Sequence, residues 1–95
     1  MFYGREEMIG PWTGVQWTDT MPAHAVIDYY TWGWPGCWDV AWMIMPTTPR
    51  LGGPAIQWKA QVERSTPYFL VYHIVVTNLT DQPIAIEGRY GILST

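Results

Sequence analysis

The fold class is decided by the stretch Ala55-Ile56-Gln57-Trp58-Lys59-Ala60-Gln61-Val62-Glu63-Arg64, in which apolar and polar side chains alternate. Successive side chains of a β-strand point to opposite faces, so this period of two predicts a strand. Its inward-facing side chains are expected to be Ile56, Trp58, Ala60 and Val62. One face of this strand is therefore expected to be buried, and the other to face water.

Strand patterns also dominate the rest of the chain. Eight prolines and nine glycines interrupt the sequence too often for a long amphipathic helix. Further strands are predicted over residues 12–17, 23–32, 37–45, 67–77 and 83–93, with a loop at 47–54 and a hairpin connection at 78–82. About six short strands separated by turns predict one all-β domain over residues 1–95, a small antiparallel β-sandwich or jelly-roll-like fold.

Composition excludes several classes of protein. The chain is 48% hydrophobic and only 14% charged, so burial can offset the entropy lost on folding and disorder is not expected. Five Lys and Arg residues against eight Asp and Glu residues, with no basic cluster, predict neither a nucleic-acid nor a membrane partner. The first residues lack a signal-peptide pattern, so we expect a soluble chain that is either cytoplasmic or secreted after loss of its signal.

The strand predicted at 67–77 is apolar on both faces, which a two-layer sandwich does not require. Its second face carries Phe69, Val71, His73 and Val75, and we expect these residues to lie in a subunit interface. The alternatives are a cover formed by Phe2, Tyr3, Met8 and Ile9, or an exposed apolar patch. An oligomer would also help to stabilise a chain of only 95 residues.

Tryptophan is the outstanding feature of the composition, with seven in 95 residues. Each aromatic ring buries on the order of 150–250 Å², so a domain of this size is expected to hold three or four in its core. The strand phases assign Trp38, Trp42 and Trp58 to the core. Four others remain, namely Trp12, Trp17, Trp32 and Trp34, and the stretch Trp32-Gly33-Trp34-Pro35-Gly36 has the composition of a surface turn.

These surplus tryptophans predict a ligand site next to the strand at 23–32. Indole rings stack on the C–H face of a sugar ring, while carboxylates and hydroxyls bond its hydroxyl groups. The residues expected to form the site are Trp32, Trp34, Asp28, Tyr30 and His24, with Trp12 and Trp17. The structural alternative is that Trp32 and Trp34 cap the open end of the sandwich.

Catalytic and metal motifs are not found in the sequence. The histidines and Cys37 lack metal-ligand spacing, and neither serine lies in a nucleophile elbow, so we expect no cofactor, no metal and no enzyme activity. The sequence therefore favours a non-catalytic, lectin-like carbohydrate-binding domain, assembled as a homo-oligomer. The alternative is a structural, self-assembling subunit whose aromatic surfaces are buried between copies.

Overall fold

The computed structural model describes residues 12–95 of the chain. This part of the chain contains six strands and no helix. The strands are β1 (Trp12–Met21), β2 (Val26–Pro35), β3 (Asp39–Pro46), β4 (Ile56–Arg64), β5 (Phe69–Asn78) and β6 (Ile84–Ser94). The all-β prediction of about six strands is confirmed. The segment with Phe2, Tyr3, Met8 and Ile9, considered as a cover for β5, lies outside the described residues.

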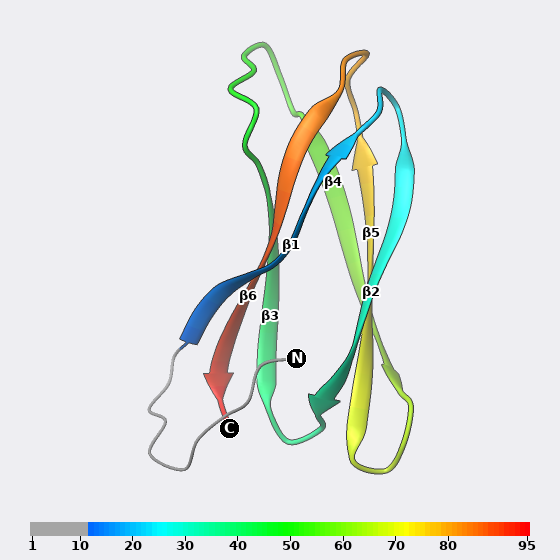
Figure 1. Cartoon of the computed structure of the whole chain (residues 1–95), viewed down its shortest axis with the longest axis vertical. Helices are drawn as coiled ribbons and strands as arrows, with labels where there is room; N and C mark the ends of the chain where they lie inside the picture. The colour runs from blue at the N-terminus through cyan, green and yellow to red at the C-terminus, as the bar shows by residue number, and fades with distance from the viewer. Residues whose placement is uncertain (1–11) are drawn as a thin grey trace.

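The strands form two antiparallel sheets of three strands each, in the orders β1-β6-β3 and β2-β5-β4. Figure 1 shows them as two twisted layers, with β6 and β5 at the centre of their sheets. Only β4 and β5 are joined as a hairpin, and the other connections cross from one sheet to the other. Residues 78–82, predicted as a hairpin connection, form one of these crossovers, because turn residues specify a reversal but not the partner strand.

Four predicted strands agree with the structure to within two residues at each end, and the other two differ by more. β1 continues to Met21 rather than ending at residue 17, because Thr18 to Met21 pair with β6 beyond a bulge between Val15 and Trp17. β2 begins at Val26, after the connection that contains His24, and continues to Pro35 instead of ending at residue 32. A second bulge, between Thr31 and Trp34, keeps this last part of β2 paired with β5.

The core lies between the sheets and comes mainly from their central strands. Each central strand has neighbours on both sides, so its inward face is covered along most of its length. The buried apolar residues are Leu70, Tyr72, Ile74 and Val76 of β5, Ile84, Ile86 and Ile92 of β6, and Met21, Trp34 and Ile44 of the edge strands. Tyr90 of β6 packs against this cluster on the same side as the three isoleucines.

Trp34 is completely buried, so its predicted position on a surface turn is wrong. Gly33 adopts φ 80° within the bulge, a conformation that suits glycine, and the bulge turns both Thr31 and Trp34 inward. The indole Nε1 of Trp34 donates a hydrogen bond to Thr31 Oγ1 over 3.0 Å. Its ring meets those of Trp42 and Tyr90 edge-on, at centroid distances of 5.4 and 5.5 Å.

The burial of the other tryptophans agrees only in part with the sequence prediction. Trp38 and Trp42 pack against the core as predicted, but Trp12 and Trp17, assigned to the surplus, pack against it as well. Trp17 fits because its ring lies on Gly88, where a Cβ atom would come within 2.4 Å of it. Trp58 was assigned to the core and is 39% exposed, because it lies on edge strand β4 beyond the cover of the opposite sheet.

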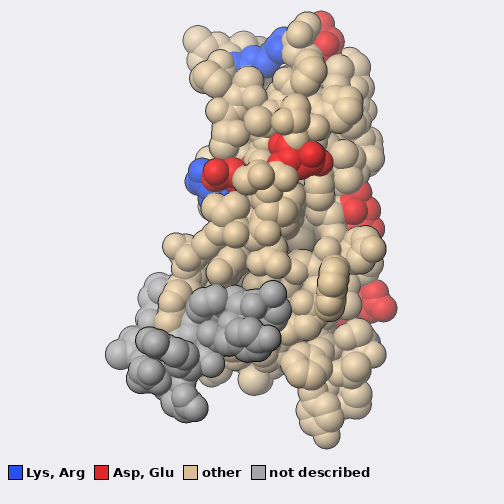
Figure 2. Space-filling view, viewed as in Figure 1, with Lys and Arg blue, Asp and Glu red and all other residues tan. Residues whose placement is uncertain are grey.

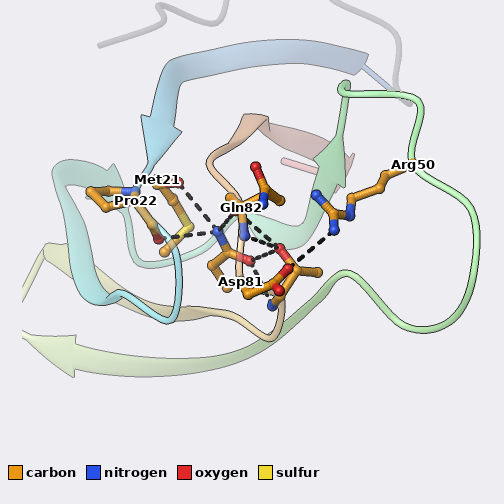
Figure 3. A network of polar contacts seen from close by, with 7 residues as sticks. Met21, Pro22, Arg50, Asp81 and Gln82 are labelled. Carbon is orange, nitrogen blue, oxygen red and sulfur yellow. Dashed lines mark hydrogen bonds and ion pairs between the residues drawn. The ribbon is translucent and has the colours of Figure 1, made fainter.

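Asn78 joins two crossovers at one end of the sandwich (Figure 3). Its side chain is buried, and Nδ2 donates to the main-chain oxygens of Met21, Pro22 and Gln82 at 2.8 to 3.2 Å. Its Oδ1 accepts from the main-chain nitrogen and the hydroxyl of Thr80. The connection from β1 to β2 is thereby held against the connection from β5 to β6. Although Asn78-Leu79-Thr80 has the sequence of a glycosylation acceptor, this nitrogen is fully engaged.

Candidate functional site

The outer face of the β2-β5-β4 sheet carries a histidine between two carboxylates. His73 of β5 lies opposite Tyr30 of β2 and Gln61 of β4. Its Nδ1 is 3.3 Å from Asp28 Oδ2, and its Nε2 is 2.9 Å from Glu63 Oε1. One imidazole therefore connects all three strands of the sheet and fixes the position of both carboxylates.

Two exposed aromatic rings lie beside this triad. Tyr30 is 62% exposed and Trp32 is 65% exposed. Their ring centroids are 6.0 Å apart, with 38° between the ring planes, and Tyr30 also lies 6.1 Å from the His73 ring. The two rings and the triad form a continuous surface that is aromatic at one end and charged at the other.

An open hollow of about 480 Å³ adjoins the rings at the side of the sandwich where β1 and β2 are the edge strands. It is lined by Gln16 and Trp17 of β1 and by Asp28, Tyr29, Tyr30, Thr31 and Trp32 of β2. Gln16 Nε2 donates to Thr31 Oγ1 over 3.2 Å, a bond that links the two sheets across the hollow. The Trp17 and Tyr29 rings stack at 5.0 Å beneath it. The hollow is thus both aromatic and polar.

Four of the residues predicted for a ligand site line this hollow, namely Asp28, Tyr30, Trp32 and Trp17. The other three do not. His24 lies in the β1–β2 connection with φ 59°, Trp12 packs against the core, and Trp34 is inside it. Gln16 was missed in the sequence because the bulge in β1 brings it toward β2. Glu63 was missed because its contact with His73 depends on the β4–β5 register.

The four residues predicted for a subunit interface lie together on the outer face of β5. Phe69 is exposed, whereas Val71, His73 and Val75 are half-buried. Polar side chains of neighbouring strands flank them, since Val75 lies between Asp28 and Lys59, and Val71 lies opposite Glu63. The long side chains of Lys59 and Glu63 can cover apolar surface with their methylene groups. This cover explains in part why β5 is apolar on both of its faces. The subunit interface stays a prediction.

Charge elsewhere is sparse. On the face drawn in Figure 2, basic and acidic side chains occur as small separate groups on a mostly uncharged surface. No group of His, Cys, Asp or Glu within residues 12–95 is placed to hold a metal ion. In the triad the two carboxylates bond opposite nitrogens of one ring, so their oxygens do not converge with a free nitrogen.

The environment of His73 favours its charged form. Hydrogen bonds to Glu63, and then to Asp28, raise the pKa of His73 above its ordinary value of 6.5, while desolvation acts in the opposite direction. On the inner side of β2, burial and the hydrogen bond from Tyr29 to Asp19 raise the pKa of the Tyr29 hydroxyl, which keeps it protonated as a donor.

The raised pKa of His73 makes stability depend on pH. The folded protein binds the His73 proton more tightly than the unfolded chain does. The contribution of protonated His73 to the free energy of unfolding is therefore complete below pH 6.5, and it is lost as the pH rises through the pKa of His73 in the folded protein. We expect the free energy of unfolding, measured in urea between about pH 5 and pH 9, to fall over this range. The fall should disappear in His73→Gln and persist in His24→Asn, which suits the positive φ at that position. Equal pH slopes in all three proteins would contradict the role given to His73.

Comparison of the chain with protein-family models, curated proteins and solved structures finds no match. The part of the chain that the structure describes has no helix long and apolar enough to cross a membrane.

Proposed function

We propose that this chain is a non-catalytic carbohydrate-binding domain, with its site at the hollow beside β2. The observation that carries the proposal is the exposed pair formed by Tyr30 and Trp32, 6.0 Å apart at the rim of a hollow with polar groups. In this site Trp32 and Tyr30 stack on a sugar ring. The Asp28 carboxylate and the Gln16 amide bond its hydroxyl groups.

The chemistry of the lining residues matches that of a sugar. A pyranose has an apolar C–H face and a polar rim, so it suits a site with aromatic surface and a few directed hydrogen-bonding groups. The Asp28 carboxylate is held by His73 and the Gln16 amide by Thr31, so neither group has to be ordered when a ligand binds. Pre-ordered contacts lose less entropy on binding.

The arrangement favours binding over hydrolysis. Glycosidases place two carboxylates on either side of the bond to be cleaved, with room between them for the sugar. Here the His73 ring occupies the space between Asp28 and Glu63 and bonds both of them. A domain of this kind holds a glycan without transforming it.

The proposal is tested by titrating a panel of mono- and oligosaccharides while following the indole N–H signals by NMR. We expect one class of glycan to shift the Trp32 signal and bind at millimolar concentration or tighter. Trp32→Ala should weaken this binding about tenfold or more, which is ~1.4 kcal/mol. The stacking surface is then absent, while the exposed position keeps the effect on folding small.

The matched control is Tyr68→Ala, which removes an exposed aromatic ring that does not line the hollow. This variant should bind the glycan as the unaltered chain does. If no sugar of the panel shifts the indole N–H signals at millimolar concentration, the proposal is overturned. So would equal weakening by Tyr68→Ala and Trp32→Ala, because binding would then not depend on the hollow.

A further inference from the structure

Strand β4 differs from the other three edge strands of the two sheets. Natural edge strands are commonly interrupted by bulges, prolines or glycines, which prevent pairing with another chain. β1 and β2 each contain a bulge, and β3 has a register shift at its start and a proline at its end. β4 pairs with β5 over nine residues without a shift, and it contains neither proline nor glycine. It is therefore a regular template for a further strand.

The backbone groups on the free edge of β4 can be assigned from its ends. Ala55 O accepts from Leu79 N, and Ser65 N donates to Phe69 O, so the odd-numbered residues of this hairpin bond toward β5. Antiparallel strands alternate between bonded and non-bonded positions. The N–H and C=O groups of Trp58, Ala60 and Val62 consequently point away from β5, toward the open edge.

The inner face of β4 is also only partly covered. Trp58 is 39% exposed and Val62 is 60% exposed, although both lie on the face that is buried in β5. The opposite sheet ends at β3, so within residues 12–95 these two side chains keep a large exposed surface. An exposed tryptophan and valine next to a free sheet edge favour the addition of a strand with an apolar inner face.

We propose that two copies of this chain associate through antiparallel pairing of β4 with β4, about a two-fold axis at Gln61. The two β2-β5-β4 sheets then form one continuous sheet of six strands. A second copy fits because the strand is complementary to itself in this register. On the outer face, Lys59 of each copy lies opposite Glu63 of the other copy, so the two-fold axis produces two such pairs. On the inner face, Ala60 of each copy lies opposite Val62 of the other.

The charges select this register over its neighbour. An axis at Ala60 satisfies the same backbone groups but places Lys59 opposite Gln61, with no ion pair. A central lysine usually protects a free edge against pairing, but here Glu63 neutralises it across the two-fold axis. Glu63 bonds His73 through Oε1 alone, so its second oxygen is available to Lys59 of the partner. Opposite charges directly across two strands stabilise their pairing.

Association is tested first by sedimentation equilibrium of the full chain and of Ala60→Pro. We expect a dimer at about 100 µM and a monomer for the variant. Proline removes an N–H that points to the free edge and leaves the bonds to β5 intact, so the monomer should keep its fold. Circular dichroism checks this point. A full chain that is monomeric at about 100 µM would overturn the proposal.

The register is tested by charge reversal. Lys59→Glu places two glutamates opposite each other, and Glu63→Lys places two lysines opposite each other, so each variant alone should have at least about tenfold weaker self-association. Mixed in equal amounts they should form a heterodimer, because both pairs then regain opposite charges. This rescue also controls for the loss of the His73 contact in Glu63→Lys. Failure of the mixture to associate would rule out the Gln61-centred pairing.

The dimer does not depend on the proposed sugar site. β4 and the hollow beside β2 lie at opposite edges of the same sheet. Ala60→Pro should therefore abolish dimers and leave the affinity of each hollow for a monosaccharide unchanged. Trp32→Ala should do the reverse. The two proposals can consequently fail separately.

Discussion

Replacing Trp34 by alanine is expected to lower the free energy of unfolding by about 3–5 kcal/mol. The indole is completely buried and contacts the rings of Trp42, Tyr72 and Tyr90, so its removal leaves a cavity at the centre of the aromatic core. Since small domains are stable by only about 5–15 kcal/mol, much of the protein should unfold at moderate temperature. Urea unfolding followed by far-ultraviolet circular dichroism measures the effect.

The control for Trp34→Ala is Trp32→Ala, two residues away on the same strand. Trp32 is exposed, so its loss should change stability by no more than about 0.5 kcal/mol. The two variants compare the buried face and the exposed face of β2 at its bulge, because the same substitution, tryptophan to alanine, is made on each face. Similar losses of stability for both variants would mean that the bulge does not turn Trp34 inward.

The second large effect is expected for Asn78→Ala. This change removes the three hydrogen bonds that Nδ2 donates and the two that Oδ1 accepts. The oxygens of Pro22 and Gln82 keep a bond from Ala25 N and from the Thr80 hydroxyl, but the Met21 oxygen and the Thr80 nitrogen lose the side-chain partner. A buried polar group left unpaired costs about 1–3 kcal/mol, so a loss of about 2 kcal/mol or more is expected. Thermal unfolding should show it as a lower midpoint.

Gln82→Ala is the matched control for Asn78→Ala. The network uses only main-chain atoms of Gln82, and its side chain is exposed, so stability should stay nearly unchanged. Asn78→Asp adds a further comparison, since a carboxylate cannot donate to the three oxygens that Nδ2 bonds. It should be at least as destabilising as the alanine variant. A stable Asn78→Asp protein would mean that these bonds do not hold the crossovers.

Side-chain periodicity was sufficient for the fold class and for individual strands. The alternation in 55–64 correctly predicted a strand and the side chains that share a face, because period two is a local property of a strand. The expectation that one of these faces is buried was wrong, since every residue of β4 after Ile56 is exposed. Periodicity failed at Trp34 because a bulge changes the phase by one residue. The glycine between two tryptophans was the available signal for that bulge, and a turn was assigned there instead.

The site was only partly predictable, for a topological reason. Asp28 and Tyr30 were recognised from their shared face on one strand, but their contact with His73 depends on which strands pair and in which register. Register between distant segments is not encoded in the pattern of either segment alone. The exposure of Trp58 has the same origin, since the sequence does not state that β4 is an edge.

The order of the strands has a consequence for how the chain folds. Of the pairings in the two sheets, only β4 with β5 joins consecutive strands, whereas β1 pairs with β6 across almost the whole described chain, as in Trp12 opposite Ile92. Long loops must close before such contacts form, so folding is expected in milliseconds to seconds, after an early β4–β5 hairpin. During synthesis, β1 and β3 have no central strand to pair with until β6 has left the ribosome. Half of the sandwich therefore assembles only after translation of its last strand.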